Sequence, residues 1–334
     1  MSPSLKEISG FSDLPEDVGR VVFELTAELD QETGRSCALV SRKVNAWIEP
    51  KLYRTLIIES AKQMENLCRI VENIINGDST KPPGFFASHV KAIAFANDRE
   101  ELAPSILSIL KACHNVERLV LWCMPLESDS EQPSQADRDL RELREFLASP
   151  ELSPRWISTG NDTFTIGEDY FSYPIFQNAT HVDLICECGL DTGRWNTLRH
   201  LPFLTHLSVF CDISMKECDR WVRETVGLGP ISLRVLIVWL PNYYFDKMNR
   251  EFEGLKAIHD GNVDSRAVVA CMENPLRACG LHPILRSYQD TVRDFAGVSV
   301  GKDFWNLAEE FIEERRRRRE VQITDTLQAS SSST

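Results

Sequence analysis

The stretch LTHLSVF, residues 204–210, decides the fold because it carries the pattern apolar-x-x-apolar-x-apolar at Leu204, Leu207 and Val209. A short run in which apolar residues alternate with others predicts a strand with one buried face. The same pattern recurs at Tyr53/Leu56/Ile58, Val90/Ile93/Phe95, Val116/Leu119/Leu121, Ala179/Val182/Leu184 and Leu233/Leu236/Val238. The chain is therefore expected to be built from repeated units.

The spacing of these copies indicates what separates the strands. Their middle positions lie 25 to 37 residues apart, except for one interval of 63 residues that has room for a degenerate copy near Arg155 to Ile157. One strand plus one helix in each such interval is typical of a leucine-rich-repeat-like solenoid. A doubly wound α/β domain also alternates strands and helices, and it is the alternative interpretation.

The fold class predicted from this pattern is α/β, with a short all-helical head, an irregular leucine-rich-repeat-like solenoid and a C-terminal capping helix. The helix at 301–320 carries Phe304, Leu307, Ala308 and Phe311 on one face and is expected to seal the last unit. The predicted parts are a flexible lead at 1–10, the head at 11–54, the repeats at 55–300, the helix at 301–320 and a disordered Ser-rich tail at 321–334.

Composition narrows the function classes. The 334 residues include 43% apolar and 26% charged residues, which is close to the globular average. A formal net charge of -13 argues against nucleic-acid binding, because an acidic protein repels phosphate. No apolar run is long enough for a membrane span, and no secretory signal is recognisable, so we expect an intracellular protein of the cytosol or nucleus with its ten cysteines reduced.

The head has more apolar surface than a small domain can bury. Pro15 suits the first turn of a helix, and one face of that helix carries Leu14, Val18, Val21, Val22, Leu25 and Leu29, with Phe23 near the opposite side. A second stretch has Cys37, Val40, Val44, Trp47 and Ile48 on one stripe, with Leu39 off it. About 44 residues bury too little surface to be stable alone, so the head should lean on the repeats or on another protein.

No motif in the sequence identifies an enzyme. Phosphate-binding, dinucleotide-binding, nucleophile-elbow and zinc-protease motifs are absent, and a single Cys-x-Cys at Cys186 and Cys188 lacks the further ligands that zinc needs. His181 and His206 occupy equivalent positions in two repeats, which repeat geometry explains without catalysis. We therefore predict no catalytic, cofactor-binding or metal-binding residues and no cofactor, and an α/β enzyme with an unrecognised site is the third interpretation.

Two further features each have two interpretations. The run Arg315 to Arg319 can be a nuclear-import or polyanion-binding patch, or the continuation of a helix in which Glu313 and Glu314 pair with arginines four residues on; we favour the helix. Trp122 and Trp239 each follow the last position of a repeat strand, where they are either core residues or contacts for a protein substrate on a concave face.

Taken together, the opening residues resemble an F-box. The stretch 11–58, FSDLPEDVGRVVFELTAELDQETGRSCALVSRKVNAWIEPKLYRTLII, is similar to fungal F-box-like proteins with degenerate leucine-rich repeats. The similarity lies in Leu14-Pro15, the apolar stretch through Val18, Val22, Phe23 and Leu25, the segment 37–41, Trp47 and the closing 52–54. Such proteins often close with a helix like that of Phe304 to Arg315.

The resemblance implies an adaptor rather than a catalyst. F-box domains dock on the Skp-type linker of an SCF (cullin–RING) ubiquitin ligase, and the repeats hold a protein substrate, here unknown. Carried over by position, the expected linker contacts are Leu14, Pro15, Val18, Phe23, Leu39, Val40 and Trp47. The basic residues of 35–54 could also meet an acidic partner. The alternative is a ligase-independent scaffold in which the head only caps the repeat array.

Overall fold

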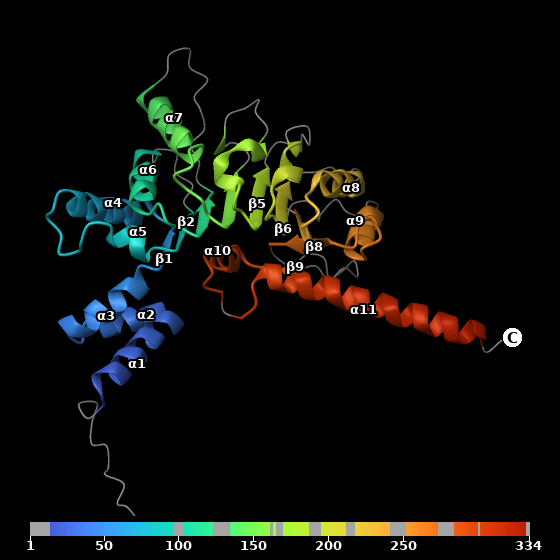
Figure 1. Cartoon of the computed structure of the whole chain (residues 1–334), viewed down its shortest axis with the longest axis horizontal. Coiled ribbons are helices and arrows are strands. Elements are labelled where there is room, and N and C mark those ends of the chain that lie inside the picture. Colours follow the sequence, from blue (N-terminus) through green and yellow to red (C-terminus); the bar gives the residue numbers. More distant parts are fainter. Residues whose placement is uncertain are drawn as a thin grey trace, which may run out of the picture.

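The computed structural model describes residues 14–96, 103–122, 134–160, 163–164, 170–186, 195–211, 218–240, 252–272, 284–299 and 301–331. The predicted flexible lead at 1–10 lies outside these residues. A long parallel sheet forms the body, the three-helix head lies at one end, and the C-terminal helix projects beyond the other (Figure 1).

Within the described residues, the sheet has nine parallel strands arranged in the order of the sequence. They are β1 Thr55–Ile58, β2 Ala92–Phe95, β3 Arg118–Leu121, β4 Trp156–Gly160, β5 His181–Cys186, β6 His206–Cys211, β7 Val235–Leu240, β8 Ala267–Cys271 and β9 Ile284–Leu285. A doubly wound sheet reverses its strand order part-way, and this sheet does not. The fold is α/β, and the doubly wound alternative is wrong.

The register of the strands follows the sequence pattern. The middle apolar positions of the repeats are paired from strand to strand: Leu56, Ile93, Leu119, Ile157, Val182, Leu207 and Leu236. Ile157 belongs to β4, which fills the 63-residue interval, so the degenerate copy expected near Arg155 to Ile157 is confirmed. The same side chains point to one face of the sheet and are almost fully buried there, Leu56 at the edge excepted.

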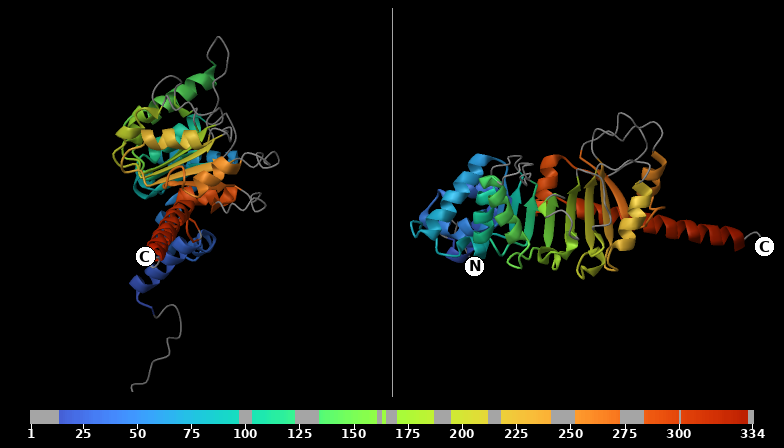
Figure 2. Two further views of the ribbon diagram at one scale, coloured as in Figure 1. Left: turned by 90° about the vertical axis from the view of Figure 1, so that its right-hand side faces the viewer. Right: turned by 90° about the horizontal axis from the view of Figure 1, so that it is seen from above.

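Helices cover this first face, which we call the outer face (Figure 2). They are α4 Ala61–Ile75, α5 Phe85–His89, α6 Ala103–Ala112, α7 Gln135–Leu147, α8 Cys218–Leu228 and α9 Phe252–His259, with 3-10 turns η4 Tyr170–Ser172, η5 Pro174–Phe176 and η7 Leu198–His200. Their apolar sides and the alternate strand residues form one continuous core. Each unit thus buries its apolar side against its neighbours.

The other face, which we call the inner face, is covered by the C-terminal helices α10 (Tyr288–Ala296) and α11 (Phe304–Ser331). Helix α10 packs on β1 to β3, and α11 packs on β7 to β9. Phe304, Trp305 and Ala308 are fully buried in this second core. The last helix was expected to seal the final unit, and its apolar side lies on the inner face of the last three strands.

Helix α11 also extends beyond the predicted boundary at residue 320. It continues to Ser331, so the predicted disordered tail at 321–334 is helical through Ser331. Thr324 and Thr326 donate their hydroxyls to the carbonyls of Glu320 and Gln322 within this segment. The segment contains no glycine or proline, and Gln322, Leu327 and Gln328 favour a helix even without a surface to pack on.

Candidate docking surface on the helical head

The head consists of three helices, α1 (Glu16–Leu29), α2 (Gln31–Ala38) and α3 (Arg42–Leu52). Local signals set their bounds: the Asp30 carboxylate accepts hydrogen bonds from the amides of Glu32 and Thr33, and the Ser41 hydroxyl accepts one from the amide of Val44. The three helices contact one another. Their apolar core is small: its buried members are Ala27, Val44 and Ile48, and Gly19 and Gly34 are also buried.

A glycine allows α1 and α2 to approach closely. A Cβ atom on Gly34 would lie 2.8 Å from the Cα and 2.9 Å from the Cβ of Ala27. Because Gly34 has no side chain, it gives α2 the flat side on which α1 packs. The helices therefore meet through small residues and leave larger apolar residues elsewhere on the surface.

The strongest apolar face of α1 points away from the rest of the head. We call it the α1 stripe, and it comprises Val18, Val21, Val22, Leu25 and Leu29. These side chains are exposed, Val21 by 53% and Leu29 by 87%. The inward side of α1 is built instead from Gly19, Phe23 and Ala27. Exposed aliphatic residues gathered on one helix face mark a protein-interaction surface more often than scattered ones do.

The turn between α2 and α3 adds two more exposed aliphatic side chains. Leu39 is 88% exposed and Val40 is 65% exposed. Both were expected to face a partner, and the structure leaves both open to solvent. The next residue, Ser41, caps α3, so the turn is fixed by local hydrogen bonds rather than by burial of its apolar residues.

The predicted linker contacts fall into two groups. Pro15, Val18, Leu39 and Val40 are exposed, and Leu14 is half-buried. Phe23 and Trp47 instead pack against the small head core, with their ring centroids 6.4 Å apart. Phe23 is partly buried because the helix packs its small and aromatic side on the head and exposes its aliphatic stripe; its contact with a linker stays a prediction.

Two lysines of α3 form ion pairs within the head. Lys43 and Lys51 of α3 form ion pairs with Glu16 and Glu28 of α1. The basic residues of 35–54 were suggested to meet an acidic partner, but these two lysines face the acidic helix of their own head. Apolar contact, rather than charge, is therefore the main feature of this surface.

The two tryptophans proposed to face a substrate are part of the inner-face core. Trp239 is 1% exposed and lies edge-on to Phe304 of α11 at 5.3 Å, while Trp122 contacts the rings of Tyr288 and Phe295. Trp239 lies on the inner face but is covered by α11, so the prediction that it contacts a substrate is wrong, and Trp122 is half-buried. Both interpretations had been open because a sequence does not reveal that α10 and α11 cover this face.

Trp122 and Trp239 lie at the two ends of a row of buried, hydrogen-bonded polar side chains. Trp122 Nε1 donates to Ser158 Oγ and Trp239 Nε1 donates to Ser208 Oγ, each at 2.6 Å. The two serine hydroxyls donate to the two carboxylate oxygens of Asp183 at 2.7 and 2.6 Å. Burial raises the pKa of Asp183 to about 6, and the serine hydrogen bonds oppose this shift only in part.

A second row of stacked rings runs beside it. The Arg118 guanidinium lies 3.5 Å from the centroid of Trp156, which stacks on His181 at 3.8 Å, which stacks on His206 at 4.1 Å. Burial lowers the pKa of His181 to about 2, so this ring is neutral near pH 7. Its equivalent position to His206 in adjacent repeats, noted in the sequence, is what brings the rings together.

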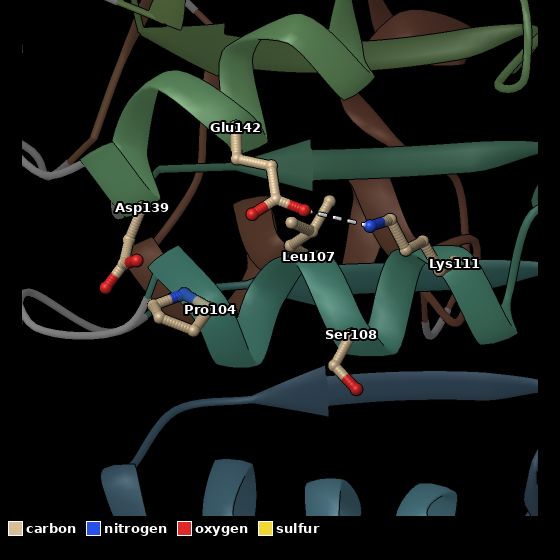
Figure 3. A pocket seen from close by; sticks show the side chains of 6 residues that line it. All are labelled: Pro104, Leu107, Ser108, Lys111, Asp139 and Glu142. Carbon is tan, nitrogen blue, oxygen red and sulfur yellow. Dashed lines mark hydrogen bonds and ion pairs between the residues drawn. The ribbon is translucent and has the colours of Figure 1, made fainter. Parts of the chain in front are cut away.

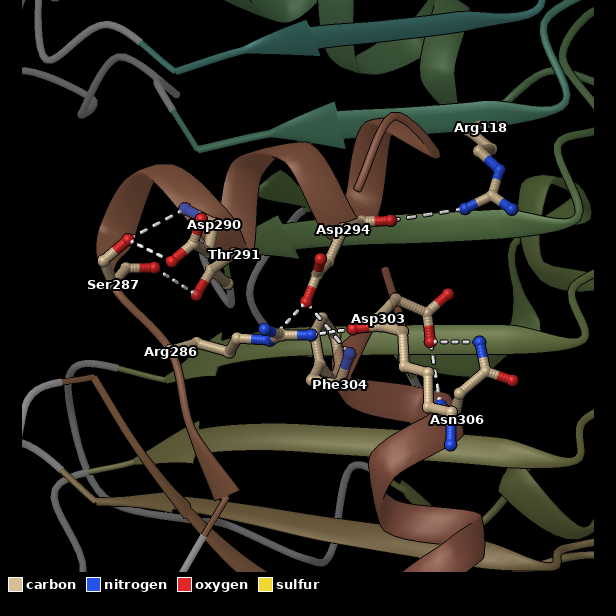
Figure 4. A network of polar contacts seen from close by, with 10 residues as sticks. Arg118, Arg286, Ser287, Asp290, Thr291, Asp294, Asp303, Phe304 and Asn306 are labelled. Carbon is tan, nitrogen blue, oxygen red and sulfur yellow. Dashed lines mark hydrogen bonds and ion pairs between the residues drawn. The ribbon is translucent and has the colours of Figure 1, made fainter. Parts of the chain in front are cut away.

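The connection between α10 and α11 is held by a buried carboxylate (Figure 4). Asp294 Oδ2 accepts a hydrogen bond from the Phe304 amide at 2.9 Å and pairs with Arg286 Nε at 2.9 Å. Arg118 donates to the carbonyls of Asp294 and Phe295 at the end of α10. These contacts fix α10 and α11 against the sheet, so both are structural parts of the body.

The arginines of the run 315–319 have two roles: some bind backbone carbonyls of the body, and the others form surface ion pairs. Arg315 Nη atoms donate to the carbonyls of Ile258, His259, Ser265 and Ala267, and Arg319 donates to the carbonyl of Asp260. Arg316, Arg317 and Arg318 pair on the surface with Glu313, Glu314 and Glu320. The helical interpretation of this run is confirmed, and two of its five arginines are also anchors.

A surface groove of about 320 Å³ lies between α6 and α7 (Figure 3). Its lining includes Pro104, Leu107 and Asp139, and an ion pair between Lys111 and Glu142 at 3.1 Å crosses it. It is an open groove between two adjacent outer helices. Among the described residues, no group of three acidic, histidine or cysteine side chains is placed to hold a metal ion.

Comparison with protein-family models and with curated proteins returned no match for this chain. None of the helices in the described part of the chain combines the length and apolar character needed to cross a membrane. What is established is therefore an α/β protein with a nine-stranded parallel sheet and a helical head that exposes an apolar stripe.

Proposed function

We propose that this protein is the substrate-receptor subunit of an SCF-type cullin–RING ubiquitin ligase. In this proposal the head is an F-box that docks on a Skp-type linker, and the body is a degenerate leucine-rich-repeat solenoid that binds a protein substrate. The observation that carries the proposal is the exposed α1 stripe. The head's small core is complete without this stripe, so it is available to a partner.

The energy of that contact supports an intermolecular role. Burying one aliphatic side chain stabilises a complex by about 1.5 to 3 kcal/mol before the costs of association, and the stripe offers five. The sequence-ordered parallel sheet with outer helices supports the repeat-solenoid part of the proposal.

The test uses two matched aspartate substitutions of exposed aliphatic residues. Leu25→Asp lies in the α1 stripe, and Ile75→Asp lies at the end of α4 on the body, where Ile75 is also exposed to solvent. We expect Leu25→Asp to weaken binding to a purified Skp-type linker at least a hundredfold, and Ile75→Asp to leave it unchanged. Isothermal calorimetry measures both. A wild-type protein that does not bind the linker, or a Leu25→Asp variant that binds like wild type, contradicts the proposal.

A ligase-independent scaffold is the second candidate, because the head also contacts the body. Lys81 pairs with Glu49 of α3 and lies over the rings of Tyr53 and Phe85, while Tyr53 packs edge-on against Phe85 and Phe86 at 5.5 Å. If the head is only a cap, the fragment 55–334 should fail to fold cooperatively. If this fragment folds and the linker binds the whole chain, the adaptor function is favoured.

A further inference from the structure

The first strand leaves one edge of the sheet open. Strand β1 pairs only with β2, and its sequence TLII contains no proline and no charged residue. Helices α4 and α10 pack on its two faces, and no described helix or strand pairs along its other side. The opposite edge differs, because β9 has only two residues and α11 packs on it.

The hydrogen-bond pattern shows which groups point to the open side. The carbonyls of Arg54 and Ile58 accept hydrogen bonds from the amides of Ala92 and Ala96 in β2. Because backbone groups alternate along a strand, Leu56 faces β2 as well, whereas Thr55 and Ile57 direct their N–H and C=O groups outward. Within the described part of the chain, no hydrogen bond reaches these outward groups.

Natural sheets protect such an edge with charges, proline, a bulge or a covering segment. Strand β1 carries none of these in its four residues, and Thr55, Leu56 and Ile57 are only half-buried, whereas the equivalent middle residues of β2 and β3 are fully buried. Leu56 packs against the outer core and Ile57 against the inner core. An added strand would therefore extend both cores as well as the hydrogen-bond ladder.

We propose that the free edge of β1 is a docking site for an extended segment of another protein, which adds a tenth strand to the sheet. Main-chain hydrogen bonds to Thr55 and Ile57 supply the affinity, and apolar side chains at alternate positions of the segment continue the two cores. The chemistry selects an extended segment whose four central residues are uncharged and include apolar side chains for both cores. This inference does not depend on the proposed function, since the head surface and this edge share no residue.

Amide hydrogen exchange of the whole protein gives the first test. In the free protein, the amides of Thr55 and Ile57 should exchange at least tenfold faster than those of Leu56 and Ile58, which lie in the ladder. Equal protection of all four would show that the edge is already occupied and would overturn the proposal. Protection of Thr55 and Ile57 that grows with protein concentration would assign the edge to a second copy instead.

A synthetic peptide gives the second test. Every strand pair in this sheet is parallel and keeps the repeat register, so a peptide with the sequence of residues 53–59, YRTLIIE, is a natural tenth strand. We expect this peptide to slow exchange of the Thr55 and Ile57 amides at least tenfold at millimolar concentration. A peptide of the same sequence with N-methyl groups on alternate amides serves as control, and equal protection by either peptide, or none by YRTLIIE, overturns the proposal.

A protein variant completes the design. Ile57→Pro removes an outward N–H and leaves the ladder to β2 intact, whereas Ile58→Pro removes a ladder N–H. Ile57→Pro should still unfold cooperatively, at a somewhat lower urea concentration because the contact of Ile57 with the inner core is lost, and should bind YRTLIIE at least tenfold more weakly. If Ile57→Pro binds the peptide like wild type, the peptide does not occupy this edge.

Discussion

At the scale of single residues, the buried Asp183 has a carboxyl group whose pKa is raised by its surroundings. Its two carboxylate oxygens receive hydrogen bonds from Ser158 and Ser208, and none of the causes of its raised pKa is a nearby cation. A buried carboxylate without a counter-ion favours its protonated form. The hydrogen bonds from Ser158 and Ser208 reduce the cost of burying this carboxyl group. They also link the neighbouring strands β4, β5 and β6 through their side chains.

The pKa of Asp183 makes stability depend on pH. Its pKa is raised from 3.8 to about 6, so the folded state holds this proton more tightly than the unfolded state. Its contribution is fully present below about pH 4 and is lost as pH rises through 6, which amounts to about 3 kcal/mol at 1.4 kcal/mol per unit. We expect Asp183→Asn to lack this loss.

The measurement is urea unfolding of wild type and Asp183→Asn at pH 4 and pH 7. The difference in unfolding free energy between the two proteins should change by a few kcal/mol between the two pH values, in favour of the variant at pH 7. Other titrating groups cancel in this comparison. If the unfolding free energies of the two proteins changed with pH in the same way, the pKa of Asp183 would not be raised in the folded state.

Arg315 and Arg317 separate an anchor from a surface arginine. Arg315 satisfies four carbonyls around the end of α9, and burial lowers its pKa to about 10, whereas Arg317 makes an exposed pair with Glu313. Arg315→Ala should therefore reduce the unfolding free energy by about 2 to 3 kcal/mol, and Arg317→Ala by less than about 0.5 kcal/mol. Chemical denaturation measures both, and equal effects would contradict the division of roles.

At the scale of helices and strands, glycines at two helical positions have opposite roles. Gly34 lies against the backbone of Ala27, which cannot move away easily, whereas a Cβ on Gly227 of α8 would meet no atom within 4 Å. Gly34→Ala should destabilise the head by about 1 to 3 kcal/mol. Gly227→Ala should be neutral or stabilise by up to about 1 kcal/mol. Amide exchange in α1 and α8 reports each effect locally, and faster exchange in α8 of Gly227→Ala would refute this assignment.

The same scale shows what a sequence can reveal about elements. The register of the strands was predictable, including the degenerate copy at Ile157, because a strand's buried positions recur at a fixed offset in every unit. The position of α11 on the inner face of the sheet was not predictable from the sequence. Phe304 and Ala308 show that this helix has an apolar side, but nothing in that periodicity distinguishes the end of the sheet from its inner face.

The head illustrates the same limit more sharply. The aliphatic stripe of α1 was recognised from its spacing, and the sequence then suggested that residues off the stripe would meet a partner. Of the two residues off the stripes, Leu39 is exposed, whereas Phe23 packs against the head core because Gly34 and Ala27 let the helices pack through their small sides. A helical pattern predicts which residues share a face, and only the packing partner decides which face is inside.

At the scale of the whole molecule, the head and the sheet bury separate cores. Ala27, Val44 and Ile48 form the head core, and the outer-face core of the sheet begins at β1. The head and the sheet meet through the Lys81–Glu49 ion pair and the aromatic rings around Tyr53. Separate cores with a narrow junction favour local opening of the smaller part before the larger part unfolds.

A substitution in the head core should therefore open the head while the sheet stays folded. Ile48 is fully buried, and Ile48→Ala removes apolar contacts from a core that has only three buried apolar residues, at a cost of about 2 to 5 kcal/mol. Such a cost exceeds what so small a domain can lose, so the amides of α1 to α3 should exchange at least tenfold faster. The amides of β3 and β6 should keep their protection, because neither strand touches the head core. Simultaneous loss of protection in β6 would instead mean that head and sheet form one cooperative unit, as expected if the head is an integral cap of the sheet.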